Sequence, residues 1–171
     1  VLFFDSDPLV LGNFIYSNWF ISEVFEFSIP EWCNQGWLVR SGLATQVQAT
    51  YGEQPLMLCK AALMEDAESF SRILAAGSPR EAKRLGRKIK GWKEELWQSR
   101  VCAVTLAVVR ARAAGLPALR EQIDGHVGLY IAEASPTDVL HGIQRSASDP
   151  LANHPRAWRG ANVLGWAYMT V

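Results

Sequence analysis

The sequence predicts an α+β fold that is mostly helical and forms one compact domain over residues 1–171. In the first fifty residues, aromatic and β-branched side chains stand between turn-forming pairs, which is typical of short strands and loops. From Thr50 onward, apolar residues recur at helical spacing. The expected strands do not alternate regularly with helices, which argues against a doubly wound sheet. A chain of 171 residues is long enough to bury a single sizeable core.

Composition narrows the class of protein. Hydrophobic residues make up 49% of the chain and tryptophan occurs seven times, so the protein is expected to be well packed, with indoles available to line a ligand pocket. The formal net charge is zero, which argues against bulk binding to duplex nucleic acid and leaves a small nucleotide or a single base as the partner. No apolar run approaches the roughly 20 residues of a membrane span, so no membrane partner is expected.

The N-terminal region is expected to supply strands. Residues 1–4, 14–21 and 24–29 have the required composition, and Asp-Pro, Gly-Asn and Ile-Pro pairs break the run between or after them. A second strand region is expected at Leu129–Ala134, whose sequence LYIAEA has the length and composition of a buried strand.

The first helix is expected in the stretch EQPLMLCKAALMED. Thr50 and Glu53 have the spacing of a capping box, but Pro55 would then be the fifth helical residue, where its ring meets the carbonyl of Tyr51. A later start, with Pro55 in the first turn, is preferable and leaves Glu53 just outside the helix. Residues 66–70 are expected to continue or close this helix.

Further helices follow. Ser78, Pro79 and Glu81 form a capping-box start for a helix over 79–89. A long central helix is expected from Lys93 to Ala114, stopped by Gly115, with a shorter one over 117–123. Its apolar stripe is Leu96, Trp97, Val101, Val104, Val108 and Ala111.

The C-terminal region carries a second cap-like sequence. Ser135, Pro136 and Asp138 repeat the pattern that begins a helix. A loop rich in Pro, Asn and Asp is expected over 146–155, and residues 160–171 are apolar enough to form a buried helix or strand.

Glu53 and Lys60 are the first candidates for chemistry. They are seven residues apart, or about 700° around an ideal helix, so within one helix they project from the same face. Leucine and methionine side chains share that face and are expected to desolvate them. A desolvated amine can act as a nucleophile and form a Schiff base with an opened sugar. The alternatives are a capping glutamate and a surface lysine whose stem packs on apolar neighbours.

Metal and cofactor chemistry is not expected. The three histidines have no zinc-ligand spacing with one another or with Cys33, Cys59 and Cys102, and no Gly-rich nucleotide motif occurs. The three cysteines are far apart and odd in number, which favours a reducing compartment, cytoplasmic or nuclear.

Five stretches of the sequence match motifs of a known family and occur in the order of that family. They are YSNWF, EQPLMLCKA, SPREAKRLGRKIKGWKEELWQSR, YIAEASPTD followed by HGI, and WRGANVLGWAYM. In these the chain resembles the NADAR family, also described as YbiA-like, across nearly its whole length. The resemblance implies a compact, mostly helical α+β domain that hydrolyses an N-glycosidic bond. One branch of the family acts on phosphoribosyl-amine intermediates of riboflavin synthesis, and another removes ADP-ribose from guanine. The expected partner is therefore a small nucleotide, an ADP-ribosylated base or ADP-ribosylated nucleic acid.

The resemblance also assigns residues. It implies that Glu53, Lys60 and Asp138 are catalytic, with Lys60 as nucleophile, Glu53 as its acid–base partner and Asp138 orienting the sugar. The residues implied to shape the pocket are Asn18, Trp19, Trp97, Arg100 and Asn162. Each has an ordinary structural alternative: core packing for the tryptophans, a surface position for Arg100, and helix capping for Asp138 and Asn162.

Some positions depart from the family pattern. Pro55 stands where aromatics are usual, His141 replaces a tryptophan before Gly142, and Gln144-Arg145 replaces Gly-Leu. These departures keep a second hypothesis open, a non-catalytic sensor that binds an ADP-ribose-like ligand. A local basic cluster over residues 83–90 is either a solvated helix face or a contact to phosphate.

Overall fold

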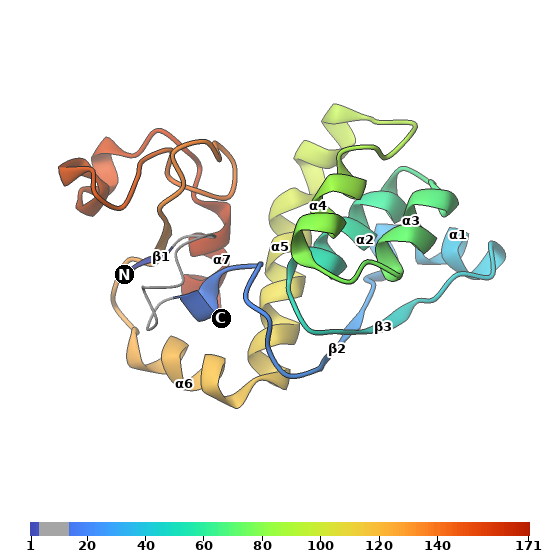
Figure 1. Cartoon of the computed structure of the whole chain (residues 1–171), viewed down its shortest axis with the longest axis horizontal. Helices are drawn as coiled ribbons and strands as arrows, with labels where there is room; N and C mark the ends of the chain where they lie inside the picture. Colours follow the sequence, from blue (N-terminus) through green and yellow to red (C-terminus); the bar gives the residue numbers. More distant parts are fainter. Residues whose placement is uncertain (4–13) are drawn as a thin grey trace.

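A computed structural model describes residues 1–3 and 14–171, and a 22-residue helix runs through its middle. In Figure 1 this helix, α5, separates a group of helices and a strand pair on one side from the C-terminal part of the chain on the other. The helices are α1 (Gln35–Arg40), α2 (Glu53–Leu63), α3 (Ala67–Leu74), α4 (Pro79–Gly86), α5 (Glu94–Gly115), α6 (Pro117–Gly125) and α7 (Val163–Thr170). The strands are β1 (Leu2–Phe3), β2 (Phe25–Ser28), β3 (Gln46–Ala49) and β4 (Ala132–Glu133). Single turns of 3₁₀ helix lie at Phe14–Tyr16, Glu31–Cys33, Pro150–Asn153 and Pro155–Ala157. The predicted α+β class, mostly helical, is confirmed.

Helix α5 forms where its apolar stripe predicts, within one residue at each end. Trp97, Val101, Val104 and Val108 are buried along one side of it, because residues three and four apart share a helix face. At its last residue, Gly115, an added Cβ would lie 2.7 Å from Cβ of Phe25. The absence of a side chain at Gly115 therefore lets β2 cross close to the end of the central helix.

Helix α2 begins earlier than predicted. Glu53 is its first residue, not a residue outside it, and the N-cap is Gly52 without a side-chain cap. Pro55 is the third helical residue and so lies in the first turn, as predicted. This start is possible because Pro55 occupies a position that needs no intrahelical N–H donor, while the N–H of Glu53 donates to the carbonyl of Asn18 at 2.9 Å.

Residues 67–74 form a separate helix, α3, rather than closing α2. Glu65 adopts a positive φ of 57°, which ends the preceding turn. Asp66 then caps α3, since its carboxylate accepts from the N–H of Ser69 at 3.0 Å. The same carboxylate accepts from the N–H of Lys90 at 2.8 Å, which fixes the chain that follows α4.

Helix α4 has the predicted start and an earlier end. Ser78 is its N-cap and accepts from the N–H of Glu81 at 3.2 Å. Glu81 reaches back to the N–H of Gly77, one residue before the cap, so the capping box is not reciprocal. The helix ends at Gly86 and not at Ile89, because the next turn is drawn toward α3 by the contact between Lys90 and Asp66 described above.

The strands form two separate pairs. β2 and β3 are antiparallel, with Phe25 opposite Ala49, and β1 and β4 are parallel, with Leu2 opposite Ala132. The strand predicted over 129–134 contracts to two residues, and Leu129 and Tyr130 are 53% and 64% exposed. That prediction was wrong for most of its length, because the ladder with β1 contains only two residue pairs.

Two other sequence predictions were wrong. Residues 14–21 form a 3₁₀ turn and a bend, in which the hydroxyl of Ser17 accepts from the N–H of Trp19 at 3.0 Å; short polar side chains that bond nearby backbone favour turns over strands. No helix follows Ser135, where the chain turns back so that the N–H of Ile143 donates to the carbonyl of Glu133. The remainder of the predicted strand at 1–4 and the breaks near residues 7 and 12 lie outside the described residues, at least in part.

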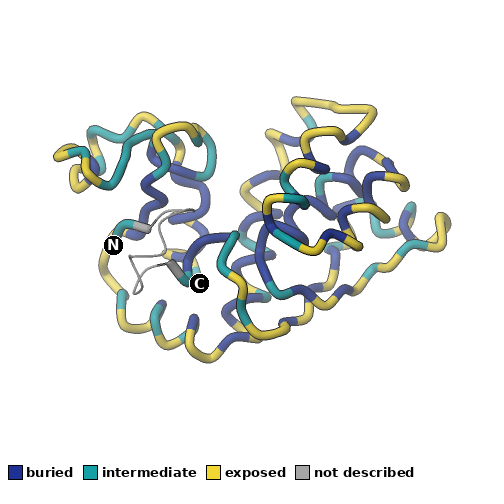
Figure 2. Tube along the Cα trace, viewed as in Figure 1, coloured by how far each residue is buried: buried dark blue, intermediate teal, exposed yellow. Residues whose placement is uncertain are grey.

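The C-terminal residues settle an alternative that the sequence left open. Residues 163–170 form a helix, α7, rather than a strand, and the predicted loop at 146–155 contains short 3₁₀ turns. Figure 2 shows the buried trace concentrated along α2, α5 and α7, with exposed positions on the outer turns. In the described part of the chain, no single helix has both the length and the apolarity of a membrane span, and α5 with α6 reaches that threshold only as a pair bent by 109°.

Candidate active site

A pocket of about 160 Å³ opens between α2, α4, α5 and the turn after β4. Residues far apart in the sequence converge on it. Its lining consists of Asn18, Glu53, Leu56, Met57, Lys60, Lys83, Arg87, Trp97, Glu133, Asp138, His141 and Leu164. The pocket therefore combines carboxylates, cations and an indole on an apolar floor, which is the composition of a small-molecule site.

Lys60 projects from the second turn of α2 and is held on several sides. Its Nζ donates to the carbonyl of Gly86, the last residue of α4, at 3.1 Å. Nζ also lies 4.4 Å from the ring centre of Trp92 and 5.6 Å from that of Trp97. A helix carbonyl and two indole faces all attract a cation, so the amine is fixed in one position beside the pocket.

The charge state of Lys60 reflects opposing influences. Burial lowers the pKa of the ammonium, and this is the largest effect. Glu53 and Glu94 raise the pKa, Arg87 and Lys83 lower it, and the net result lies below the ordinary value for lysine. A neutral amine, the form that acts as a nucleophile, is therefore more accessible here than on a solvated lysine.

Glu53 stands two turns before Lys60 and lines the same pocket, as the seven-residue spacing predicts. Its residue surface is only 4% exposed. Neighbouring α2 residues Leu56 and Met57 form the apolar floor, which agrees with the expected desolvation. The pair thus places a carboxylate and an amine on one face of one helix, where the carboxylate raises the pKa of the amine.

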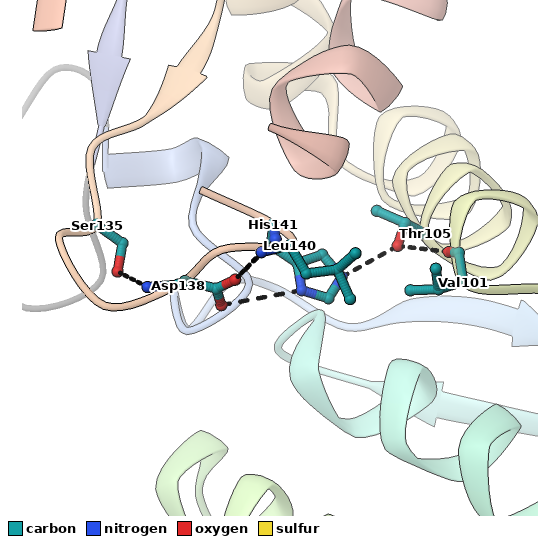
Figure 3. A network of polar contacts seen from close by, with 6 residues as sticks. All are labelled: Val101, Thr105, Ser135, Asp138, Leu140 and His141. Carbon is teal, nitrogen blue, oxygen red and sulfur yellow. Dashed lines mark hydrogen bonds and ion pairs between the residues drawn. The ribbon is translucent and has the colours of Figure 1, made fainter. Parts of the chain in front are cut away.

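Asp138 lies at the centre of a hydrogen-bonded turn (Figure 3). Its Oδ1 accepts from the backbone N–H groups of Leu140 and His141, at 2.9 and 2.7 Å, while its own N–H donates to the Ser135 hydroxyl. Burial alone would raise the pKa of the Asp138 carboxyl, but His141, these two N–H groups and Lys83 outweigh it and hold the pKa below its usual range. Asp138 is therefore an ionised, rigidly held carboxylate rather than a helix cap.

His141 continues this network into α5 (Figure 3). Its Nε2 lies 3.2 Å from Oγ1 of Thr105, and Thr105 donates its hydroxyl proton to the carbonyl of Val101 at 2.8 Å. Since a threonine hydroxyl has one proton, its oxygen is left to accept, which places a proton on Nε2 of His141. The other ring nitrogen, Nδ1, lies 4.0 Å from Oδ2 of Asp138.

Asn18 closes the pocket beside the start of α2. Its Oδ1 is buried and, among the described residues, has no hydrogen-bond partner. A Cβ added at Gly52 would lie 2.5 Å from that oxygen, so the glycine makes room for the amide. An acceptor oxygen on the wall of a polar pocket is suited to a sugar hydroxyl or a base amino group.

The sequence as a whole matches a known family. A sequence model of the NADAR domain covers residues 9–171. The chain belongs to the NADAR family. Protein irg-1 of Caenorhabditis elegans is 33% identical to it over 118 residues, a match that covers 68% of the chain and 56% of irg-1. N-glycosidase R617 of Acanthamoeba polyphaga mimivirus is 26% identical over 171 residues, which covers the whole chain and 93% of that protein. The chain thus spans just over half of one relative and most of the other.

Of the eight residues that the sequence analysis selected as candidates for the site, five line the pocket: Asn18, Glu53, Lys60, Trp97 and Asp138. The other three lie elsewhere. Trp19 lines an adjoining groove. Arg100 is exposed on α5, with its guanidinium 5.9 Å from the ring centre of Trp32.

Asn162 does not line the pocket, and its contacts are structural. It is buried, with a φ of 50°, as the residue before α7. Its Oδ1 accepts from the N–H of Glu133 at 3.2 Å and its Nδ2 donates to the carbonyl of Ile131 at 2.9 Å. Asn162 therefore holds β4, and with it Glu133, in position.

Sequence reasoning did not select three residues of the site as candidates. Glu133 was taken as part of a strand, His141 was noted only as a departure from the family pattern, and Trp92 was not considered. A glutamate within a run of small apolar residues was a usable signal for Glu133, since a glutamate side chain is rarely fully buried. No local pattern points to Trp92, because it reaches Lys60 only through packing.

The described residues do not form a cluster of metal-ligating side chains. Residues 1–3 and 14–171 contain no group of three or more His, Cys, Asp and Glu side chains that could hold an ion. Independence from metal stays a prediction.

Proposed function

We propose that the protein is an N-glycosidase that hydrolyses the bond between a base and the sugar of an ADP-ribosyl or phosphoribosyl compound. The observation that carries the proposal is the convergence of Glu53, Lys60 and Asp138, from α2 and the turn after β4, on one pocket in which the Lys60 pKa is lowered. Family membership supports it, as does the relative R617, whose name is N-glycosidase.

In the proposed reaction, the neutral Nζ of Lys60 attacks the anomeric carbon. The bond from that carbon to the base nitrogen breaks, and its electron pair leaves with the base. Glu53 takes the proton that the attacking amine loses and passes a proton to the base nitrogen, which makes the base a better leaving group. The sugar ring can then open to a Schiff base, and water releases the sugar and restores the amine, so that one water is consumed per bond broken.

Asp138 and Asn18 act on the sugar in this proposal. An ionised carboxylate accepts hydrogen bonds from hydroxyl groups, and it stabilises the positive charge that develops near the anomeric carbon. Because the pKa of Asp138 is held low, the carboxylate keeps its charge throughout the neutral range. Oδ1 of Asn18, which has no hydrogen-bond partner among the described residues, offers a second acceptor in the same pocket.

The test is turnover of ADP-ribosylated guanosine and of the phosphoribosyl-amine intermediate of riboflavin synthesis, followed by release of the free base. We expect hydrolysis of at least one of them, and a loss of at least about 10²-fold in kcat for Lys60→Ala and Glu53→Gln. Lys93→Ala removes an exposed lysine outside the pocket and is the matched control.

A covalent adduct gives a second readout. Reduction with borohydride during turnover should trap the sugar on Lys60, detectable by mass spectrometry of the peptide that contains residue 60. Unchanged turnover in both variants would refute the roles assigned to Lys60 and Glu53. Tight binding of a substrate without release of any base by the unmodified protein would favour the alternative, an ADP-ribose-binding sensor.

A further inference from the structure

The water that completes the proposed reaction needs a residue to take its proton. Glu53 serves the attacking amine and the departing base, but the water that releases the sugar from Lys60 must also lose a proton. We propose that His141 is a further catalytic residue: its Nδ1 holds this water together with Oδ2 of Asp138 and accepts the proton. The inference rests on the proposed function, because it adds a residue to the second half of that reaction.

The ring of His141 is held in one orientation (Figure 3). Its backbone N–H donates to Oδ1 of Asp138 at 2.7 Å. Its Nε2 lies 3.2 Å from Oγ1 of Thr105, whose own proton is donated to the carbonyl of Val101 at 2.8 Å. The Thr105 hydroxyl therefore accepts from Nε2, and the proton of the neutral ring is on that nitrogen. Nδ1 of the same ring is then an acceptor.

Nδ1 and Oδ2 of Asp138 are two acceptors at a separation that one water molecule spans. They lie 4.0 Å apart, which is longer than the roughly 2.7–3.2 Å of a direct hydrogen bond. Two acceptors that each lie about 2.8 Å from one water oxygen are about 4–4.6 Å apart. Water has two protons and can donate to both acceptors, whereas a sugar hydroxyl has one proton and can donate to only one. The geometry therefore favours water at this point.

The two acceptors belong to the same cavity as the reactive amine. His141 and Asp138 line the pocket with Lys60 and Glu53. Their side chains are 15% and 22% exposed, so both are largely removed from bulk solvent. His141 and Asp138 come from the turn after β4, whereas Lys60 and Glu53 come from α2. A water molecule held by the turn therefore meets a sugar that is attached to the helix.

Of the two acceptors, the imidazole is the better base. The pKa of the Asp138 carboxyl is held below its usual range, so its carboxylate takes up a proton only weakly. An ordinary imidazole titrates near neutrality, where a general base is most effective. His141 is itself one of the groups that lower the pKa of Asp138, because an imidazolium and a carboxylate attract each other. Asp138 therefore stabilises the imidazolium that forms when His141 accepts a proton.

The proposed step begins with the protonated Schiff base on Lys60. The water oxygen bonds to the Schiff-base carbon, one water proton moves to Nδ1 of His141, and the π electron pair of the carbon–nitrogen bond moves to Nζ. The imidazolium returns its proton to this nitrogen, and the carbon–nitrogen bond breaks with its electron pair on Nζ. The remaining hydroxyl proton leaves through Nδ1 to solvent as the sugar carbonyl forms. One water is consumed, and the neutral forms of Lys60 and His141 are restored.

Rapid-quench kinetics of base release test the proposal, with whichever of the two substrates named above the protein hydrolyses. The amide of His141→Gln can still reach Thr105 but cannot act as a base. We expect its steady turnover to fall at least about 10²-fold, after a faster release of about one base per protein molecule. Borohydride should then trap more sugar on Lys60 than in the unmodified protein. His154→Gln replaces an exposed histidine outside the pocket and is the matched control.

Thr105 is a positioning residue, since it acts through the ring of His141. Thr105→Val keeps the shape of the side chain but removes the acceptor, so the steady rate should fall by about tenfold. Thr105→Ser keeps the hydroxyl and should slow turnover less. Heteronuclear NMR of the histidine rings gives a readout without turnover. We expect the proton of the neutral His141 ring on Nε2 in the unmodified protein, and a mixture of the two tautomers in Thr105→Val.

Three results would overturn the inference. A proton on Nδ1 of the neutral ring would do so, because that nitrogen could not then accept from water. An equal slowing of the first base release and of steady turnover in His141→Gln would show a structural role, as would trapped adduct no more abundant than in the unmodified protein. These results refute the role of His141 alone. Absence of base release by the unmodified protein would instead refute the proposed function, and this step with it.

Discussion

At the scale of single residues, the balance of charges around Lys60 decides whether its amine can react. The indoles, the Gly86 carbonyl and Glu53 all favour the ammonium, while burial, Arg87 and Lys83 favour the neutral amine. Burial is the largest of the effects on the pKa, so the amine is neutral at a lower pH than that of an ordinary lysine.

Glu94 offers a way to move this balance from outside the pocket. Its carboxylate raises the pKa of Lys60, so Glu94→Gln should lower that pKa and increase the fraction of neutral amine at a given pH. We expect the rising limb of the pH–rate profile, and of the pH dependence of chemical modification at Lys60, to shift to lower pH. Glu95→Gln is the matched control. A shift to higher pH, or none, would contradict the assigned charge balance.

At the scale of elements, the helices were predictable and the strands largely were not. The same sequence pattern, Ser-Pro with an acidic residue three positions after the serine, occurs twice. It begins helix α4 at Ser78, but at Ser135 it forms only a turn. After Ser135, the carboxylate of Asp138 takes the N–H groups of Leu140 and His141, and the chain reverses. Helix signals are local, whereas a strand forms only where a partner strand meets it, which explains why 129–134 contracted to two residues.

The start of α2 gives a test at this scale. Gly52 has an ordinary φ of −70°, so alanine is conformationally acceptable there, but its Cβ would lie 2.5 Å from Oδ1 of Asn18 and 3.2 Å from Cδ of Arg112. Gly52→Ala should therefore destabilise the protein by about 1–3 kcal/mol, through overpacking. Urea denaturation measures the change.

The control for this test is Gly125→Ala at the end of α6, where a Cβ meets nothing within 4 Å. It should be neutral or slightly stabilising, because alanine is the better helix former. If Gly52→Ala is as stable as Gly125→Ala, Asn18 moves aside freely and is not held at the pocket wall.

At the scale of the whole molecule, a fully buried arginine joins three parts of the chain. Arg112 of α5 donates to the carbonyl of Ile15 at 2.9 Å, to that of Tyr16 at 3.5 Å and to the hydroxyl of Tyr168 on α7 at 2.5 Å. The central helix is thereby tied to the N-terminal segment that leads to Asn18 and to the C-terminal helix. These long-range ties fix the position of the pocket walls relative to one another.

Replacing Arg112 tests this role. Arg112→Met keeps much of the side-chain volume but removes the donors, so we expect a loss of about 1–3 kcal/mol for each buried acceptor that is deprived of its partner. Arg110→Met, on the exposed side of the same helix, should change the free energy of unfolding by less than about 0.5 kcal/mol. An unchanged midpoint of urea denaturation for Arg112→Met would show that packing alone joins the three parts.

The site was only partly predictable for the same reason that the fold was. Glu53 and Lys60 lie within one helix, so their common face follows from helical geometry. Glu133 and His141 reach the pocket through the turn after β4, and Trp92 through the connection between α4 and α5. Those placements depend on tertiary packing, which no periodicity in the sequence encodes.

The sequence separation of the pocket walls has a consequence for biosynthesis. Asn18 and Leu164 line the same small cavity, so the cavity is absent from a nascent chain until almost the last described helix has been made. Contacts of such long sequence range form late, after local helices. A chain without α7 lacks Leu164 in the pocket wall, so Lys60 would be more exposed to water and less readily deprotonated than in the complete fold.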